Sequence, residues 1–490
     1  MSGLFGVVSK NNCVDNLFYG TDYHSHLGTE FAGLAVWDGR FRREIHNISD
    51  TQFKAKFQDY HYRIKGRKGI GVISSFDEQP IYINSHLGEF CIVTSGLVQN
   101  DEVLISMLLK KGVSFNELSS EKINITELIA KLITQGSSLI DGIERVFDLI
   151  DGSCSMLILT KEGIYAARDR YGYTPLVIGR NDEVWAVASE TTAFPNLGLK
   201  IFKYLGPGEI ILLTENGLLS KSEGRTITQI CSFLWIYTGF PASSYEGRNV
   251  EVVRENCGRL LARRDKDINV DIVCGVPDSG ISHALGYAME SGKPYRRPLV
   301  KYTPGYGRSY TPLTQEKRDF IAKMKLIPIR EIIEGNRIVV CEDSIVRGTQ
   351  LKNFTIKKLW EAGAKEIHIR VACPPLLFPC RFCLSTRSID ELATRRTIRA
   401  IEGEDIEDVR EYIDHNNPHY KMMVERIAGD LEVTTLRYQT ISDMISAIGL
   451  PKEKLCLYCW TGEYISSPKI DKLINKKLNP EVIEGKNLIL

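Results

Sequence analysis

The stretch that decides the fold is Arg337-Ile-Val-Val-Cys-Glu-Asp-Ser-Ile-Val-Arg-Gly-Thr-Gln350. It reads as a buried strand that ends in two acids, Glu342 and Asp343, followed by a short loop and the start of a helix. Backbone N–H groups of such a loop and the helix N-terminus bind phosphate, and the hydroxyls of Ser344 and Thr349 can add donors. The two carboxylates can instead accept hydrogen bonds from sugar hydroxyls. The loop therefore predicts a sugar phosphate as ligand; the alternative is an N-capping loop with solvated acids.

The residues around this loop alternate between helical and strand patterns. Helices are expected over residues 252–264, 280–289 and 349–362, and strands over 270–276, 336–341 and 365–372. This order predicts a parallel sheet with its ligand site at the carboxyl ends of the strands. Residues 1 to about 225 are rich in short strands with occasional helices, which predicts an α+β layer structure.

Length and composition exclude several classes of protein. The 490 residues correspond to about three domains, or two large ones. With 43% hydrophobic and 25% charged residues the chain is expected to be globular, and a net charge of +1 argues against a non-specific nucleic-acid binder. No apolar run is long enough to span a bilayer, and the first residues lack the pattern of a secretory signal. A cytoplasmic protein without a membrane partner is expected.

The loop closely resembles the phosphoribosyl-pyrophosphate (PRPP) motif of type I phosphoribosyltransferases, in the version found in the glutamine PRPP amidotransferase (amidophosphoribosyltransferase) family. Glu342 in place of the family's first Asp and Gln350 in place of a usual Thr are mild departures. Further similar segments follow in the family's order: Arg168-Asp-Arg-Tyr-Gly-Tyr-Thr-Pro-Leu176, Ala188-Ser-Glu190, Val276-Pro-Asp-Ser279, and Tyr306-Gly-Arg-Ser-Tyr310 with Gln315 and Arg318. The resemblance implies an enzyme of de novo purine synthesis in which ammonia attacks C1 of the PRPP ribose and pyrophosphate leaves.

The resemblance also implies roles for individual residues. The PRPP-binding residues would be Glu342, Asp343, Ser344, Ile345, Val346, Arg347, Gly348 and Thr349. The first two would hold the ribose hydroxyls and the others the 5-phosphate. Asp278 and Ser279, with the acid pair, would lie near the pyrophosphate and a Mg²⁺ ion that neutralises it. Residues 301–325, with Lys301, Tyr306 and Arg308, would form a closing lid; the alternative is an ordinary basic surface loop.

The domain organisation implied by the resemblance has three parts. Residues 1–228 would form a class II glutamine amidotransferase-like domain with the αββα sandwich of the amino-terminal-nucleophile (Ntn) hydrolases. Residues 229–448 would form the α/β type I phosphoribosyltransferase domain. Residues 449–490 would form a tail.

The chain has twelve cysteines, most of them inside apolar strand-like runs. Cys456 and Cys459 form a C-x-x-C pair, which can bind metal, take part in redox exchange, or do neither. One branch of the family carries a [4Fe-4S] cluster on four cysteines, and the matching positions are Cys231, Cys380, Cys456 and Cys459. Four thiolates are what such a cluster needs, and its role here would be structural; zinc is the rival. Cys373 and Cys383 are interpreted as bystanders.

The glutamine site of the family is altered in this sequence. The family uses an amino-terminal cysteine, exposed by processing, to attack the side-chain amide of glutamine; here the position holds Ser2, a weaker nucleophile. The family's carboxylate clamp, oxyanion pair and amine acceptor align with Ser74, Ser95-Gly96 and Ile125. A lost charge-assisted contact costs about 1.5–3 kcal/mol, and a lost oxyanion donor about 10²–10³ in rate. We therefore expect this half to be a scaffold that no longer uses glutamine.

The resulting hypothesis is an amidophosphoribosyltransferase-like enzyme that uses ammonia and is impaired with glutamine. Two alternatives stay open. One is a non-catalytic paralogue that binds PRPP or nucleotides and regulates or partners an active enzyme. The other is a phosphoribosyltransferase with another acceptor. Purine nucleotides are expected as feedback ligands, and a homo-oligomer, dimer or tetramer, as the assembly.

Overall fold

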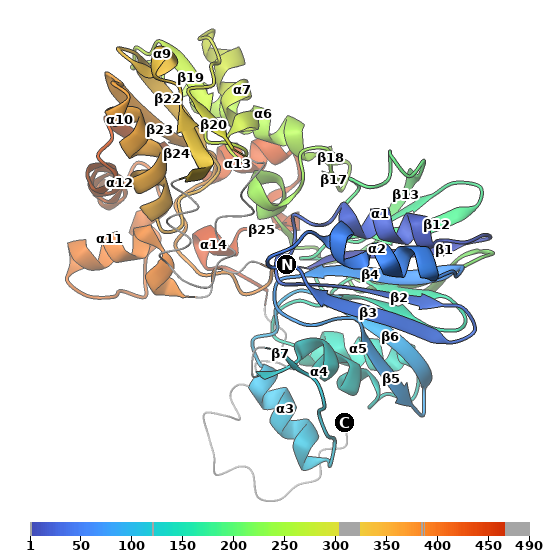
Figure 1. Ribbon diagram of the computed structural model, residues 1–490. Helices are drawn as coiled ribbons and strands as arrows, with labels where there is room; N and C mark the ends of the chain where they lie inside the picture. The colour runs from blue at the N-terminus through green and yellow to red at the C-terminus, as the bar shows by residue number, and fades with distance from the viewer. Residues whose placement is uncertain (1, 120–121, 303–323, 384–385, 387, 466–490) are drawn as a thin grey trace, which may run out of the picture.

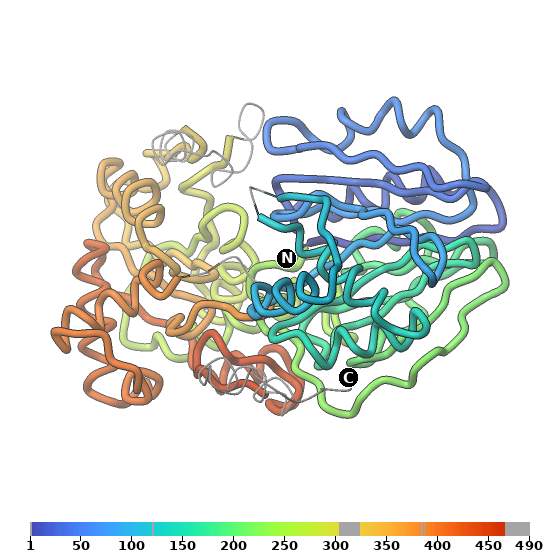
Figure 2. The backbone as a smooth tube through the Cα atoms, turned by 90° about the horizontal axis from the view of Figure 1, so that it is seen from below, coloured from blue at the N-terminus to red at the C-terminus, as the bar shows by residue number. Residues whose placement is uncertain are grey.

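The computed structural model describes residues 2–119, 122–302, 324–383, 386 and 388–465. The chain forms two bodies that lie side by side (Figures 1 and 2), the first in blue to green and the second in yellow-green to red. None of the helices in the described residues is long and apolar enough to cross a membrane.

The first body contains two antiparallel sheets. The strands of the seven-stranded sheet are, in order, β13 (Lys200–Tyr204), β11 (Val177–Arg180), β12 (Val184–Ala188), β1 (Gly3–Ser9), β4 (Lys68–Ser74), β2 (Phe31–Trp37) and β3 (Phe41–Asn47). Those of the six-stranded sheet are β15 (Gly217–Glu223), β14 (Glu209–Thr214), β10 (Ile164–Ala167), β9 (Ser155–Leu159), β6 (Gly88–Ser95) and β5 (Ile81–Ser85).

The two sheets pack face to face and are covered by helices on their outer faces. Leu4 and Val72 of one sheet share a fully buried core with Val93 and Leu157 of the other. The seven-stranded sheet is covered by α1 (Val14–Asp22) and α2 (Phe53–Arg63), and the six-stranded sheet by α3 (Asp101–Lys110), α4 (Ile125–Ile133) and α5 (Leu139–Leu149). Because each sheet has two apolar faces, it needs a covering layer on both sides. The predicted αββα sandwich is confirmed.

The second body is built on a parallel sheet of four strands, in the order β19 (Ile272–Gly275), β22 (Arg337–Glu342), β23 (Glu366–Val371) and β24 (Thr435–Tyr438). The helices that accompany it include α6 (Val250–Arg263), α7 (Ile281–Ser291), α10 (Lys357–Glu361), α11 (Ala393–Glu402), α12 (Pro418–Leu431) and α13 (Ile441–Ile448). Residues 338–341 are fully buried, as expected for a parallel strand covered on both faces. The predicted α/β domain is confirmed, although the helix expected over 349–362 is a π-helical segment, η2 (Leu351–Ile356), that continues into α10.

Residues 455–460, from the expected tail, are part of the core of the second body. Strand β25 (Leu455–Cys456) pairs in parallel with β16 (Ile230–Cys231), so that Cys456 lies opposite Cys231. The ring of Trp460, in α14 (Tyr458–Thr461), stacks on Phe233 with 5.6 Å between ring centroids. Residues 455–460 therefore join the start of the second body.

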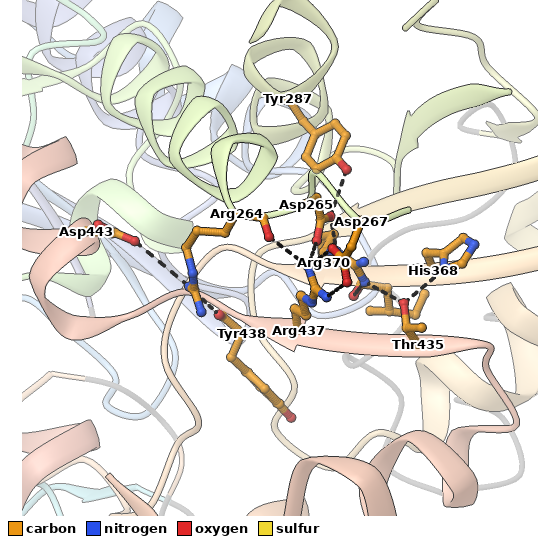
Figure 3. A network of polar contacts seen from close by, with 11 residues as sticks. Arg264, Asp265, Asp267, Tyr287, His368, Arg370, Thr435, Arg437, Tyr438 and Asp443 are labelled. Atoms are coloured by element: carbon orange, nitrogen blue, oxygen red, sulfur yellow. Dashed lines mark hydrogen bonds and ion pairs between the residues drawn. The ribbon is translucent and has the colours of Figure 1, made fainter. Parts of the chain in front are cut away.

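A buried polar network fastens helices α6 and α7 to the sheet (Figure 3). Asp265, just after α6, forms ion pairs with Arg370 of β23 and Arg437 of β24. Tyr287 of α7 donates a 2.7 Å hydrogen bond to the same carboxylate. Arg370 and Asp265 are almost completely buried, so each charge depends on the other for compensation.

Candidate functional site

The acid pair lies at the carboxyl end of β22, at the centre of the parallel sheet. Ser279 Oγ donates a 2.9 Å hydrogen bond to Glu342 Oε1, and the backbone amide of Asp343 donates to the same oxygen at 3.1 Å. Burial, and next the charge of Asp343, raise the pKa of Glu342 well above its usual range. The segment that carries Asp278 and Ser279 therefore lies against the acid pair, as two neighbouring parallel strands allow.

Asp278 itself is exposed and forms an ion pair with Lys301. Lys301 is the last residue of β20 (Leu299–Lys301) and the first residue of the expected lid. The other two lid residues, Tyr306 and Arg308, lie outside the described residues. The pair thus connects the expected pyrophosphate segment to the base of the expected lid.

The loop after the acid pair turns sharply into η2 and is attached to α11. Gly348 has φ +77°, a conformation that glycine adopts readily, which explains this residue at the turn. Ala393 donates its backbone N–H to the carbonyl of Val346 at 2.7 Å, and Arg347 forms an ion pair with Glu391. The Ser344 hydroxyl, expected to face phosphate, donates to Asp343 Oδ2 at 2.6 Å.

Arg254, a buried arginine in α6, was missed by the sequence reasoning. Its guanidinium donates 2.8 Å hydrogen bonds to the carbonyls of Trp235, Tyr237 and Gly239. Burial lowers the pKa of Arg254, and the negative charge of Asp343 opposes this shift. The positive charge of Arg254 therefore interacts with the negative charge of Asp343.

In the first body, the structure brings together the three serines that are expected to stand at the family's glutamine site. Ser2 Oγ donates to Ser74 Oγ at 3.4 Å, and Ser95 Oγ donates to the Ser2 carbonyl at 2.7 Å. The Ser74 hydroxyl also accepts the backbone N–H groups of Phe76 and Asp77, at 3.3 and 3.2 Å. All three serines are buried. Strands β1, β4 and β6 thus bring their ends to one point, where the serine hydroxyls bond to each other or to the backbone of Ser2.

Two further residues border this point. Gly96 has φ +144°, and a Cβ atom there would lie 2.1 Å from the carbonyl oxygen of Ser153, so only glycine fits. Ile125 begins α4, where the backbone N–H groups of Ile125 and Thr126 hydrogen-bond to Asp77. Burial raises the pKa of Asp77 to about 6. The sequence analysis did not identify Asp77. Its carboxyl group lies beside Ile125, the position at which the family's amine acceptor is expected.

A second buried acid, Glu190, contacts both bodies. Its Oε1 atom lies 2.9 Å from His26 Nε2, and its Oε2 atom accepts a 2.7 Å hydrogen bond from the Tyr245 hydroxyl. Burial would raise the pKa of Glu190, but His26, His24 and the hydrogen bond from Tyr245 together outweigh burial, and the pKa falls to about 2. Glu190 thus stays charged and joins the first body to the segment before α6.

Five cysteines line one cavity, the thiol cavity, together with aromatic side chains. The cysteines are Cys231, Cys380, Cys383, Cys456 and Cys459, and the aromatic residues are Phe233, Phe382 and Trp460. Cys383, interpreted from the sequence as a bystander, lines the cavity beside the four cysteines expected as ligands. The signal was present in the sequence, since Cys380-Arg-Phe-Cys383 is a second C-x-x-C pair.

The thiols of this cavity interact with each other and with backbone amides. Cys380 Sγ accepts backbone N–H groups from Phe382 and Cys383, both at 3.4 Å. Hydrogen bonding to Cys380, and next burial, raise the pKa of Cys459 well above its usual range. A bound cation would offset the charge of the buried thiolates.

The donor set of the cavity fits a group bound by thiolates, since its polar donors are sulfur atoms and its remaining wall is aromatic. Among the described residues, no three His, Cys, Asp or Glu side chains are already arranged to hold a single metal ion. The cavity thus has the sulfur ligands of a metal site, but its described residues do not surround a single metal ion.

Comparisons with known proteins match both bodies. The family described as a glutamine amidotransferase domain matches residues 67–196. The amidophosphoribosyltransferase of Methanothermobacter thermautotrophicus is 31% identical, over 94% of this chain and 93% of that protein. The glutamine PRPP amidotransferase of Bacillus subtilis, solved in complex with ADP and GMP, superposes with a TM-score of 0.80 at 30% identity, covering 94% of this chain and 97% of that one. A structure described as the allosteric regulatory enzyme of purine biosynthesis gives 0.80 at 29% identity, covering 94% and 96%. By its similarity across both bodies, this chain belongs to the amidophosphoribosyltransferase family.

Proposed function

We propose that this chain makes 5-phosphoribosylamine from PRPP in purine biosynthesis, with free ammonia as the nitrogen donor. The observation that carries the proposal is the 2.9 Å hydrogen bond from Ser279 Oγ to Glu342 Oε1. It joins the segment proposed for pyrophosphate to the acid pair proposed for ribose. A ligand with a 5-phosphate, a ribose and a pyrophosphate needs the loop after Asp343, the acid pair and the segment of Asp278 and Ser279 side by side.

The proposed reaction exchanges one bond at C1 of the ribose. The bond from C1 to the pyrophosphate oxygen breaks, and the ammonia nitrogen forms the new bond as it loses a proton. Glu342 and Asp343 orient the ribose hydroxyls, and the backbone amides of residues 344–349 hold the 5-phosphate. Mg²⁺, which neutralises the leaving pyrophosphate, would bind beside Asp278. The residues act mainly by positioning and by excluding water.

The impaired use of glutamine rests on the three serines. A substrate carboxylate and amine need charged partners, but Ser2, Ser74 and Ser95 offer hydroxyls. The Ser2 hydroxyl already donates to the Ser74 hydroxyl, and the Ser95 hydroxyl to the Ser2 carbonyl. The nearby carboxyl of Asp77 is occupied by the N–H groups that begin α4. Bound glutamine would break these hydrogen bonds and would form no ion pairs to compensate for the free energy lost.

The thiol cavity is proposed to hold a [4Fe-4S] cluster on Cys231, Cys380, Cys456 and Cys459, with zinc as the rival. A cluster is larger than one ion, which suits a cavity whose thiols are not arranged around a single point. When bound, it would join the tail to the start of the second body and to the loop that carries Cys380. Its role is structural.

Purine nucleotides are proposed as feedback ligands. The B. subtilis relative was solved with ADP and GMP. A nucleoside monophosphate carries the same ribose 5-phosphate as PRPP, so the loop after β22 is the proposed site for one of them.

The test is the release of pyrophosphate from PRPP and Mg²⁺ with ammonium or glutamine supplied separately. We expect release with ammonium, little with glutamine, and none with the Asp343→Asn variant. The variant Asp414→Asn, at an exposed carboxylate, is the matched control. PRPP binding without release under any condition would instead support the non-catalytic paralogue, and release only with another amine or base would support a different acceptor.

A further inference from the structure

Residues 234–245, which precede α6 and are called the bridging segment below, are held from both bodies. From the first body, Glu190 Oε2 accepts hydrogen bonds from the Tyr245 hydroxyl at 2.7 Å and from the backbone N–H of Phe240 at 3.3 Å. Glu190 is fully buried, so water cannot replace a bond that is lost there. One carboxylate of the first body therefore fixes two points of the bridging segment.

The residues after Glu190 extend the same contact. The Thr192 hydroxyl donates to Glu190 Oε1 at 2.9 Å and shares a hydrogen bond with the Ser243 hydroxyl. The backbone N–H of Ser244 donates to Thr191 Oγ1 at 2.8 Å. The Glu190 carboxylate thus lies at the centre of a buried polar contact between the first body and the bridging segment.

Backbone carbonyls of the bridging segment bond to the helices of the second body. Arg254 of α6 donates to three of these carbonyls, as described above. His283 of α7 hydrogen-bonds to a fourth, that of Ile236, at 3.2 Å, and its other ring nitrogen lies 3.1 Å from the carbonyl of Arg254. Both side chains are buried. The bridging segment therefore holds the first turn of α7, which begins at Ile281.

The first turn of α7 follows directly on the residue that contacts the acid pair. Ser279 lies two residues before α7 and donates its hydroxyl hydrogen to Glu342. Gly280, between them, lies so close to β22 that a Cβ atom there would be 2.1 Å from the carbonyl oxygen of Cys341. Residues packed this closely cannot shift independently. A displacement of His283 would therefore move Ser279 relative to Glu342.

We propose that Glu190 is a positioning residue for PRPP binding, which keeps Ser279 and the acid pair in their binding arrangement by holding the bridging segment. The segment transmits this constraint through Arg254 and His283. The inference rests on the proposed function of the PRPP site. It also gives the first body a role that needs no glutamine, since a charge of that body positions a site in the other.

The experiment compares two buried hydrogen bonds, each from a tyrosine to a carboxylate. Tyr245→Phe removes the bond to Glu190, and the matched control Tyr287→Phe removes the 2.7 Å bond to Asp265 in the network of Figure 3. Both tyrosines are fully buried, so both variants should lose stability to a similar degree. Glu190→Gln is the second test variant, because it removes the charge and keeps the shape of the side chain.

Each full-length variant is first checked by urea unfolding, so that only folded protein is compared. Calorimetry then gives the Kd for PRPP with Mg²⁺, and pyrophosphate release gives kcat and the KM values for PRPP and ammonium. We expect Tyr245→Phe and Glu190→Gln to raise the Kd and KM for PRPP by about three- to ten-fold, the range that one lost hydrogen bond allows. The KM for ammonium should not change. Tyr287→Phe should keep the wild-type values, because a purely structural loss does not alter the binding site of a chain that remains folded.

Two results would overturn the inference and leave the proposed function intact. One is a wild type that binds PRPP no more tightly than Tyr245→Phe and Glu190→Gln do. The other is a rise in Kd for Tyr287→Phe as large as that for Tyr245→Phe. If Glu190→Gln does not fold, Tyr245→Phe decides, since it keeps both the aromatic ring and the carboxylate. A wild type that neither binds nor consumes PRPP would overturn the proposed function, and the inference with it.

Discussion

The backbone N–H of Leu97 donates a 2.9 Å hydrogen bond to the carbonyl of Phe382. Leu97 directly follows Gly96 in the first body, and Phe382 lies between two cysteines of the thiol cavity. Ser153 Oγ donates to the same carbonyl at 2.6 Å, and Arg381 forms a 2.6 Å ion pair with Asp151. The loop that lines the thiol cavity therefore also holds the loops beside the three serines in place.

Removing the proposed metal should loosen this contact. We expect faster amide hydrogen exchange at residues 95–99 and at Ser153 after chelation, because exchange rises where local structure opens more easily. Exchange in the buried strand β14, which β10 and β9 separate from β6 in the sheet order, serves as the internal control. Unchanged protection at Leu97 after verified metal loss would show that the cavity does not support this loop.

Weakening the ion pair between Arg347 and Glu391 should impair binding of PRPP. Both side chains are partly exposed, so Glu391→Gln should cost about 1 kcal/mol, or about a five-fold rise in KM for PRPP. We expect kcat to change less, because the pair holds the phosphate loop and does not touch the reacting atom. Glu361→Gln, at an exposed pair on α10, is the control for the steady-state kinetics. Equal KM values for the two variants would contradict this role.

Breaking the buried network around Asp265 should destabilise the second body. Arg370→Met leaves the carboxylate of Asp265 buried with one charged partner fewer, which costs about 3–5 kcal/mol in the free energy of unfolding. Urea unfolding of Arg370→Met, Asp265→Asn and the double variant measures this cost. We expect the double variant to lose less than the sum of the two single losses. Strict additivity would mean that the two residues are not coupled.

Acid should destabilise the first body through His24, which is completely buried. Burial lowers its pKa from 6.5 to about 4. Between pH 6.5 and about 4 the unfolded chain binds a proton that the folded chain does not, so the free energy of unfolding falls as the pH falls, by at most about 3 kcal/mol. His24→Asn should lose less stability over this window than the wild type, measured by urea unfolding. His415→Asn, at an exposed position, should lose as much as the wild type; a His24→Asn variant that also does so would contradict the prediction.

The sequence predicts best those features that depend on neighbouring residues. The apolar run before Glu342 and the loop after it predict a strand and a turn, which the structure contains because both depend on one short segment; the phosphate site in the same segment stays a prediction. Strand and helix patterns likewise predict both fold classes. The resemblance identifies Ser2, Ser74 and Ser95, and the structure brings them within hydrogen-bonding distance.

The sequence analysis did not predict contacts between residues that are far apart in the chain, because such contacts leave no local pattern. The pairing of Glu190 with Tyr245 spans 55 residues, and no local pattern indicates which buried acid meets which hydroxyl. Asp77 was missed because its role depends on how α4 begins beside it. Cys383 differs, since its C-x-x-C spacing was visible but was not weighed as a metal-binding pair.

The central claim is that the acid pair and the loop after β22 bind PRPP. Calorimetric titration of PRPP into the full chain, with and without Mg²⁺ and without any amine, tests it most directly. The account predicts Mg²⁺-dependent binding that Asp343→Asn weakens by about 10-fold or more, since a hydrogen bond to a charged group is worth about 1.5–3 kcal/mol. No binding to the wild type, or equal binding to the wild type and Asp343→Asn, would contradict it.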